Sequence, residues 1–201
     1  MINNDEFNGK NILVTGGTGS IGSEIVKQLF HNYTPKTIRI FSRSEDKHYI
    51  LMQKLSPENH KLRFIVGDIR DKDRLRLAME NIDIVFHAAA LKHVPICEDN
   101  PFEVVKTNIF GTQNVIDLAM ELNVKKVISI STDKVVDPTN VMGVSKLMGE
   151  KLILASYYYQ GEKMTKFACV RFGNVLGTNG SIVPLLKSQI KNGNFVTLTD
   201  P

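Results

Sequence analysis

The segment T-G-G-T-G-S-I-G, Thr15 to Gly22, is the part of the sequence that most restricts the fold. It follows a short apolar run, N-I-L-V-T (11–15), and it opens a helical pattern at 20–32. Glycines with this spacing between a strand and a helix permit a tight turn and a close approach of the backbone to a pyrophosphate. The segment therefore predicts a dinucleotide-binding unit, and the alternative is a tight turn without a ligand. We assign cofactor binding in this loop to Gly16, Thr18, Gly19, Ser20, Ile21 and Gly22.

Short apolar runs alternate with helical patterns along the whole chain. Runs rich in Ile, Val and Phe predict strands at 11–15, 37–42, 62–67, 83–88, 126–131 and 167–172. Helical patterns lie at 20–32, 71–80, 101–122 and 142–160, and a further one spans G-S-I-V-P-L-L-K-S-Q-I-K-N-G. Asn100 is the expected N-cap of the third helix, with Pro101 at its first position and Glu103 at its third. Nearly continuous apolar strands alternating with helices predict an α/β fold, a doubly wound parallel sheet of the Rossmann type.

Composition excludes several classes of protein. The 201 residues suffice for one compact α/β domain, and the net charge of +4 arises from 25 basic and 21 acidic residues spread along the chain. This mild excess suits an anionic small molecule and does not form a stripe for nucleic acid. The only two cysteines, Cys97 and Cys169, are far apart, which favours a reducing, cytoplasmic setting. No apolar run approaches the roughly 18 residues of a membrane span, and the polar N-terminus lacks the apolar core of a signal peptide.

The residues after the second, third and fourth strands refine the cofactor prediction. An acidic residue at the end of the second strand would bind the ribose 2′-hydroxyl of NAD, but this chain has Ser42 and Arg43 there. Because a guanidinium suits a 2′-phosphate, we predict NADP over NAD, with a solvated Arg43 as the alternative. Asp68, followed by Ile69, is a candidate for the adenine amino group. Ala88, Ala89 and Ala90 are small enough for a dinucleotide to lie close to the backbone, and packing in the core is the alternative explanation of their size.

Several segments together resemble one family. They are the G-G-T-G-S-I-G loop, G-D-I-R, H-A-A-A-L-K-H-V-P, V-K-T-N-I-F-G-T-Q-N-V, S-T-D-K, and V-R-F-G-N-V-L-G with G-S-I-V-P. With these segments the chain resembles the extended short-chain dehydrogenases/reductases, and more narrowly their polysaccharide-biosynthesis branch, the UDP-N-acetylglucosamine 4,6-dehydratases. The resemblance covers essentially the whole chain. A-A-A-L-K-H-V-P and S-T-D-K are specific to that branch, whereas the glycine loop is common to all relatives.

The resemblance implies a division of the chain and a missing part. Residues 1–175 would form the NADP-binding domain, and residues 176–201 would begin a small sugar-nucleotide-binding domain. Since family members continue further, we expect this chain to be the front part of a longer protein with an incomplete substrate pocket. We therefore expect the chain alone to be inactive and the full-length form to be a homo-oligomer.

The resemblance also implies roles in proton transfer. The wider family carries Y-x-x-x-K, where the tyrosine takes a sugar hydroxyl proton and the lysine binds the nicotinamide ribose. Here Lys146 keeps the lysine position but Met142, which cannot transfer a proton, fills the tyrosine position. Tyr157, Tyr158 and Tyr159 lie too far along the same helix to replace the tyrosine.

The S-T-D-K segment follows the fifth strand, at the edge where open α/β sheets bind ligands. By resemblance, Asp133 would be the acid to the leaving C6 hydroxyl and Lys134 the base at C5, with Lys134 at a lowered pKa. Lys134, Thr132 or a water would take the C4 hydroxyl proton. The alternative is that Asp133 and Lys134 form an ion pair that caps the following loop.

On the substrate side, the resemblance places Lys92 and His93 near the sugar and cofactor, with Asn174 as a candidate for the diphosphate. Asn108, inside a long helix, is expected to bridge to the backbone of the fifth strand. Arg171 is a candidate structural partner within the strand end, and Cys97 is a packing residue. No histidine spacing suggests a metal ligand.

The leading hypothesis is an NADP-dependent UDP-N-acetylhexosamine 4,6-dehydratase, with or without inversion at C5. A UDP-hexose 4-epimerase is the nearest alternative, because it shares the scaffold and only moves hydride at C4. A non-catalytic dinucleotide-binding protein is an alternative of another class, favoured by Met142. The combination of Lys146, Asp133 and Lys134 argues against it, because a sensor needs only the cofactor site.

Overall fold

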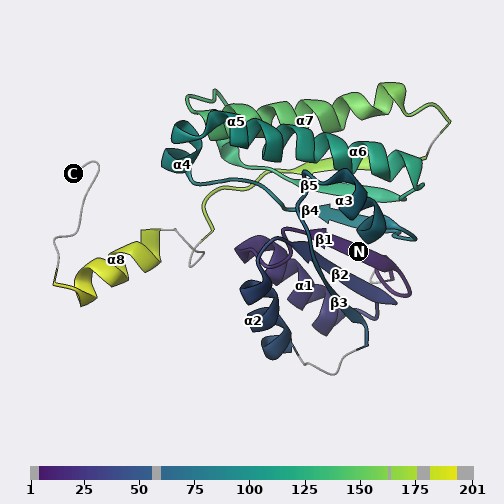
Figure 1. The fold of residues 1–201 in the computed structure, drawn as a ribbon, viewed down its shortest axis with the longest axis horizontal. Helices are drawn as coiled ribbons and strands as arrows, with labels where there is room; N and C mark the ends of the chain where they lie inside the picture. The colour runs from purple at the N-terminus through teal and green to yellow at the C-terminus, as the bar shows by residue number, and fades with distance from the viewer. Residues whose placement is uncertain (1–4, 56–59, 163, 176–181, 194–201) are drawn as a thin grey trace. The chain divides into compact units, whose positions relative to one another are not determined.

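The computed structural model describes residues 5–55, 60–162, 164–175 and 182–193. The chain forms two compact units, Met1–Arg171 and Phe172–Pro201. Strands and helices alternate through the first unit, and the second contains α8 (Figure 1). The strands are β1 (Asn11–Thr15), β2 (Thr37–Ser42), β3 (Leu62–Val66), β4 (Ile84–His87), β5 (Lys126–Ile130) and β6 (Lys166–Val170). The helices are α1 (Ser20–Asn32), α2 (Glu45–Leu55), α3 (Lys72–Met79), α4 (Val94–Asp99), α5 (Pro101–Val104), α6 (Gly111–Glu121), α7 (Val141–Tyr159) and α8 (Ile182–Lys191), with a π-helical segment at Val105–Phe110 and a 3₁₀ turn at Asp133–Val135.

The six strands form one parallel sheet in the order β3-β2-β1-β4-β5-β6. Strand β1 pairs with β2 on one side and β4 on the other, so the direction of winding reverses between β1 and β4. This is the doubly wound parallel sheet of the Rossmann type, as the sequence predicts.

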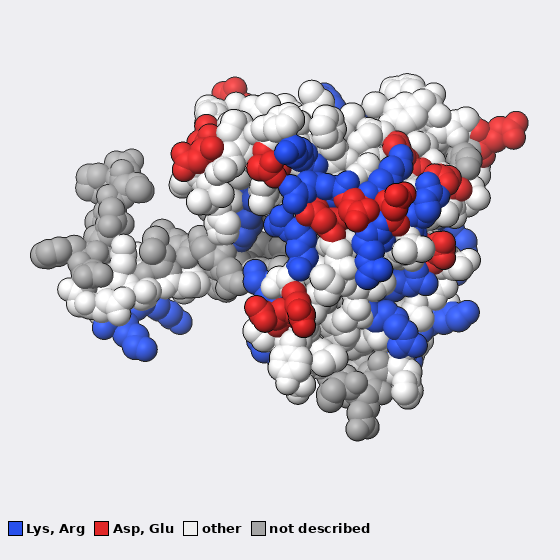
Figure 2. Space-filling view, in the orientation of Figure 1, with Lys and Arg blue, Asp and Glu red and all other residues white. Residues whose placement is uncertain are grey.

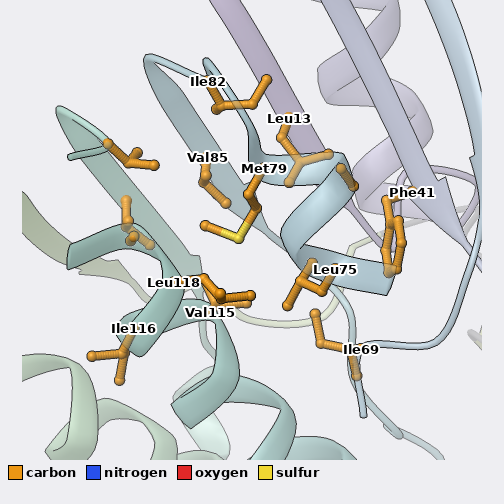
Figure 3. Packing of buried hydrophobic residues seen from close by; sticks show 14 of the residues in the cluster. Leu13, Phe41, Ile69, Leu75, Met79, Ile82, Val85, Val115, Ile116 and Leu118 are labelled. Carbon is orange, nitrogen blue, oxygen red and sulfur yellow. The ribbon is translucent and has the colours of Figure 1, made fainter. Parts of the chain in front are cut away.

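Alternate residues of the central strands build a core on each face of the sheet. On one face, Leu13 of β1 and Val85 of β4 pack with residues of α3 and α6, including Leu75 and Leu118 (Figure 3). On the opposite face, strand residues pack against Val26 and Leu29 of α1 and against Leu51 and Leu55 of α2. Burial on both faces explains why the strands read as continuous apolar runs rather than as alternating ones.

Where α3 lies beside α6, the surface carries charges of both signs. Arg76 pairs with Glu121, Lys72 pairs with Asp117 at 2.8 Å, and Arg70 pairs with Glu103 of α5 at 2.6 Å. Figure 2 shows these basic and acidic side chains interleaved over this face. The interleaving agrees with the small net charge and leaves no single-sign stripe on this face.

The structure corrects several predicted elements. Helices α2 and α4 are absent from the prediction, and the single helix expected at 101–122 is divided into α5, the π-helical segment and α6. Asn100 does occupy the N-cap position of α5, but its side chain donates to the carbonyl of Ile96 and does not cap the helix. Pro95 lies in the first turn of α4, and Pro101 lies in the first turn of α5. Because the proline ring is tolerated in the first turn of a helix but not in its interior, each proline marks the start of a separate helix.

Among the helices of the described ranges, none has the length and apolar character needed to cross a bilayer.

Candidate active site

The loops that follow the parallel strands leave the sheet at its carboxyl edge. Open parallel sheets bind ligands at this edge, beside the point where the strand order reverses. Here that point lies between β1 and β4, and the loops after these two strands touch. A Cβ on Gly16 would lie 2.7 Å from the amide nitrogen of Ala89 and 2.8 Å from the carbonyl oxygen of Ala88. The predicted cofactor loop and the predicted Ala88–Ala90 segment are thus neighbours.

The glycine loop is closed so tightly that larger residues cannot replace Gly16 or Gly22. Gly16 has a φ of +64°, and a Cβ on Gly22 would collide with the carbonyl of Gly16. Helix α1 then begins at Ser20, with Gly19 as its N-cap, without a side-chain cap and without an acidic residue in its first turn. The first-turn amides of an uncapped helix bind anions. This cradle therefore fits a pyrophosphate, with Ser20, Ile21 and Gly22 supplying the first-turn backbone.

The end of β2 is joined to the glycine loop by hydroxyl groups. Ser42 Oγ lies 2.7 Å from Thr18 Oγ1 and 2.9 Å from His48 Nε2 of α2. Burial lowers the pKa of His48, although its contact with the Ser42 carbonyl opposes that effect. Arg43 is exposed at the same edge, and its charge is close enough to lower the pKa of Asp68. Sequence reasoning named Ser42 and Arg43 and missed His48, which fixes the Ser42 hydroxyl.

The carboxylate of Asp68 is held by Arg70. Its oxygens accept hydrogen bonds from the Arg70 amide at 2.9 Å and from the guanidinium at 2.6 and 3.0 Å. Burial raises the pKa of Asp68, but the bonds from Arg70 outweigh it and keep the group ionised. The neighbouring Ile69 is buried in the core, so its side chain contributes packing rather than a contact at the edge.

Beyond β4, Ala88, Ala89 and Ala90 are partly buried, and Lys92 and His93 are exposed on the loop that leads into α4. His93 is the N-cap of α4, but its side chain makes no capping bond.

A chain of buried hydrogen bonds runs from β1 to α7 beneath this edge. His87 at the end of β4 lies 2.8 Å from Thr15 Oγ1 through Nδ1 and 3.0 Å from Thr112 Oγ1 through Nε2. Thr112 donates to the carbonyl of Asn108, and Asn108 donates to Ser145 of α7 at 2.9 Å. Burial, with a smaller contribution from the charge of Lys146, lowers the pKa of His87 to about 3, so the ring is neutral. Sequence reasoning missed His87 because a single histidine within an apolar strand gives no spacing signal.

The expected bridge from Asn108 to the fifth strand is wrong. Its Oδ1 accepts from the amide of Leu91 at 2.8 Å, and its Nδ2 donates to the Leu91 carbonyl at 3.0 Å. The side-chain amide of Asn108 therefore bonds both the N–H and the C=O of Leu91 in the loop after β4, as a neighbouring strand would. Asn108 lies in the π-helical segment Val105–Phe110, where the wider turn brings its side chain onto that loop.

The S-T-D-K segment leaves β5 and enters the 3₁₀ turn. Thr132 Oγ1 donates to Asp133 Oδ1 at 2.8 Å, and Lys134 Nζ lies 3.3 Å from the same oxygen. The bond from Thr132, followed by that from Lys134, lowers the pKa of Asp133. The ion pair that was the alternative interpretation is thus present, on an exposed part of the edge where ligands have access.

Lys146 and Met142 lie on the same helix but in different surroundings. Lys146 Nζ donates to the carbonyl of Ile130, the last residue of β5, at 2.8 Å. Burial lowers the pKa of Lys146 to about 8, against opposing effects of Cys169 and Glu150. Met142 is 5% exposed and packs with Cys97 and Val104 in an apolar cluster that joins α4, α5 and α7. The tyrosine position of the wider family is therefore filled here by a packing residue.

The other candidates divide between structural and unplaced residues. Arg171 has a structural partner, but the partner is Glu150 of α7, with which it forms a bidentate pair, and not a residue of the strand end; Cys97 is fully buried. The three tyrosines at 157–159 are exposed at the far end of α7. Asn174 belongs to the second unit, and 176–181 and 194–201 lie outside the described residues. Within the described residues, no three or more His, Cys, Asp and Glu side chains gather to hold a metal ion.

Comparison with known proteins gives one family for this architecture. The family model described as polysaccharide biosynthesis protein matches residues 12–201. An uncharacterised membrane protein of Methanocaldococcus jannaschii is 57% identical over 97% of this chain and 58% of its own length. A UDP-N-acetylglucosamine 4,6-dehydratase (inverting) of Campylobacter jejuni is 49% identical over 94% of this chain and 56% of its own length. A UDP-glucose 4-epimerase of Rickettsia canadensis is 43% identical over 97% of this chain and 58% of its own length.

Solved structures share the fold at high similarity. The X-ray structure of Pen from Bacillus thuringiensis has a TM-score of 0.93 and 49% identity, covering 96% of this chain and 61% of that one. MoeE5 in complex with UDP-glucuronic acid and NAD has a TM-score of 0.75 and 26% identity, covering 89% of this chain and 60% of that one. The chain thus spans somewhat over half the length of the relatives that it matches.

Proposed function

Since this chain belongs to the polysaccharide biosynthesis protein family of the extended short-chain dehydrogenases/reductases, we propose that it carries the cofactor and proton-transfer residues of a UDP-N-acetylhexosamine 4,6-dehydratase. The observation that carries this proposal is the group Thr132, Asp133 and Lys134, which stands at the edge directly after β5, where partly buried Lys146 binds the Ile130 carbonyl. An acid and a base at this edge are what dehydration requires. The 49% identical dehydratase supports the assignment.

The proposed cofactor is NADP. Gly16, Gly19 and the uncapped first turn of α1 would hold the pyrophosphate. Exposed Arg43 would bind the 2′-phosphate, because no acidic residue stands at the end of β2 to bind a 2′-hydroxyl. Asp68 is the proposed partner of the adenine amino group, and Lys146 that of the nicotinamide ribose. The similar MoeE5 structure holds NAD, so the preference for NADP depends on Arg43 alone.

The proton transfers at C5 and at the C6 oxygen are assigned to Lys134 and Asp133. When bound, the oxidised nicotinamide would take a hydride from C4 and return it to C6. The C4 hydroxyl proton would pass to Lys134, Thr132 or a water as the hydride leaves. Lys134 removes the C5 proton, and Asp133 gives a proton to the C6 oxygen, which leaves as water. Lys134 then returns a proton to C5 as the hydride adds to C6. General acid–base assistance of this kind contributes about 10²–10⁴-fold to a rate.

The hydrogen bonds around Asp133 set a condition on this mechanism. Asp133 is ionised in the ion pair, yet it must be protonated to act as an acid, and Lys134 must be neutral to act as a base. One proton passing from Lys134 Nζ to Asp133 Oδ1, across their 3.3 Å contact, prepares both groups. Exclusion of water by a bound substrate favours this neutral pair, because burial disfavours charged forms.

Substrate contacts and setting complete the proposal. Lys92 and His93 would contact the sugar from the loop after β4, and Asn174 the diphosphate. Residues 176–201 would begin the sugar-nucleotide-binding domain of a homo-oligomeric protein. The free cysteines Cys97 and Cys169 support a reducing, cytoplasmic setting.

Replacing Lys134 with Ala tests the proposal. In the complete protein, Lys134→Ala should lower dehydration by about 10²-fold or more, because the base at C5 is lost. NADP binding should not change, since this side chain is not assigned to the cofactor. Lys151→Ala, an exposed lysine of α7, is the matched control and should behave as the wild type. Full turnover by Lys134→Ala would overturn the assignment.

A 4-epimerase is the second candidate, favoured by relatives of 42–43% identity that carry that name. Epimerisation needs no proton transfer at C5 or C6, so it leaves the Asp133–Lys134 pair without a role.

A further inference from the structure

Lys146 and Glu150 carry opposite charges on the side of α7 that faces the sheet: Lys146 binds the end of β5 and Glu150 pairs with Arg171 after β6. They stand four residues apart on α7 and therefore lie on one face of the helix, one turn from each other. Lys146 is anchored to the end of β5 through the Ile130 carbonyl. Glu150 is 5% exposed, although an ionised carboxylate is costly to bury unless it is paired.

Arg171 supplies that pairing from the end of β6. Its Nε and Nη2 donate to both carboxylate oxygens of Glu150, at 2.6 to 3.2 Å, and its own side chain is half exposed. Arg171 also follows Val170, whose carbonyl accepts the Ser131 amide at 2.8 Å, at the start of the S-T-D-K segment. The ion pair is thus built into the part of the sheet that presents the proposed reacting groups.

We propose that Glu150 is a positioning residue of the site: held by Arg171, it supplies the fixed negative charge that keeps the partly buried Lys146 charged beside the cofactor edge. The proposal rests on the proposed function only where it places Lys146 beside a dinucleotide.

Of the titratable groups that affect Lys146, only Glu150 carries a negative charge near neutral pH. His87 of β4 is neutral, since burial lowers its pKa to about 3. Burial raises the pKa of Cys169 of β6 to about 11, so its thiol carries no charge near neutral pH. Glu150 is ionised, because the bond from Arg171 outweighs burial and holds its pKa below the ordinary value. Burial holds the pKa of Lys146 at about 8, so a change in one nearby charge alters its charged fraction near neutral pH.

The test is a titration of Lys146 in the cofactor-free protein, followed by the ¹³Cε resonance of its side chain and assigned with Lys146→Arg. Glu150→Gln keeps an oxygen that accepts from Arg171 but removes the charge. It should lower the Lys146 midpoint from about 8 by about half a pH unit or more, because the ammonium loses its counter-charge. A residue with a packing role only would leave the midpoint unchanged.

Two further variants keep the test decisive. Arg171→Met should also lower the midpoint, because without the bonds from Arg171 the buried Glu150 carboxylate no longer keeps its negative charge. Glu162→Gln makes the same chemical change beyond the end of α7, about 20 Å along the helix from Lys146, and should have no effect. Equal midpoints in the wild type, Glu150→Gln and Arg171→Met would overturn the proposal. NADP binding by the wild type is measured separately, and its absence would count against the proposed function instead.

Discussion

Met142 is interpreted differently from its position in the sequence and from its surroundings in the structure. In the sequence it stands at the tyrosine position of Y-x-x-x-K and suggests a damaged dehydrogenase. In the structure it is buried against Cys97 and Val104, and its carbonyl accepts the hydroxyl of Ser145, which in turn accepts from Asn108. The residue therefore contributes to the packing that holds α4 and the loop after β4 on α7.

A packing role for Met142 predicts tolerance of a similar volume. Met142→Leu should cost less than about 1.5 kcal/mol of unfolding free energy, whereas Met142→Ala should cost about 2–5 kcal/mol. Chemical denaturation of the two variants measures both values. If Met142→Leu kept its stability and its NADP affinity but lost turnover, the thioether would have a part in the chemistry, contrary to this assignment.

At the same scale, some site residues were predictable and others were not. The glycine loop, Arg43 and the S-T-D-K segment are contiguous motifs directly after strands, so their place at the edge follows from the parallel topology. Other site residues act through contacts with residues 6 to 72 positions away in the sequence, namely His48, His87 and Glu150. No local spacing in the sequence indicates these contacts. Asn108 was recognised as unusual within a helix, but its partner was wrongly predicted, because a single sequence does not show a π-helical turn.

At the scale of elements, that π-helical segment is the least regular feature of the site. In this wider turn the Asn108 carbonyl accepts a hydrogen bond from the Thr112 hydroxyl, and the Asn108 side chain accepts one from the Leu91 amide. Such turns are rare and are often found at functional sites. Here the segment joins α5 and α6 to the loop that carries Lys92 and His93.

Removing the Asn108 amide should therefore disturb both stability and the edge. Asn108→Ala leaves the Leu91 amide and carbonyl and the Ser145 hydroxyl without this partner, and it should cost about 3 kcal/mol. Asn32→Ala, at the exposed end of α1, is the control and should change stability by less than about 0.5 kcal/mol. Denaturant unfolding of both variants is the measurement. Equal stability of the two would show that the bonds to Leu91 contribute nothing.

Most elements were predictable, and the exceptions have physical causes. Parallel strands covered on both faces give apolar runs that are easily recognised, and the six predicted strands match to within two residues at each end. Helix α2 was missed because four of its first five residues are polar, E-D-K-H, and only Leu51 and Leu55 with His48 are buried. Helix α4 was missed because Pro95 and Pro101 confine it to six residues.

At the scale of the whole molecule, the first unit holds every residue assigned to the cofactor and to proton transfer. The relatives are nearly twice as long as the part that this chain matches. The named relatives divide between a UDP-N-acetylglucosamine 4,6-dehydratase and UDP-glucose 4-epimerases. What separates these two reactions is whether the C5 proton leaves the sugar.

The most direct test of the central claim is the fate of that proton. The complete protein with NADP is incubated with UDP-N-acetylglucosamine in D₂O, and the product is examined by NMR and mass spectrometry. The Asp133–Lys134 assignment predicts a 4-keto-6-deoxy sugar that carries solvent deuterium at C5, because the base exchanges its proton with water. A product that is the C4 epimer, with hydrogen retained at C5 and oxygen at C6, would contradict the assignment.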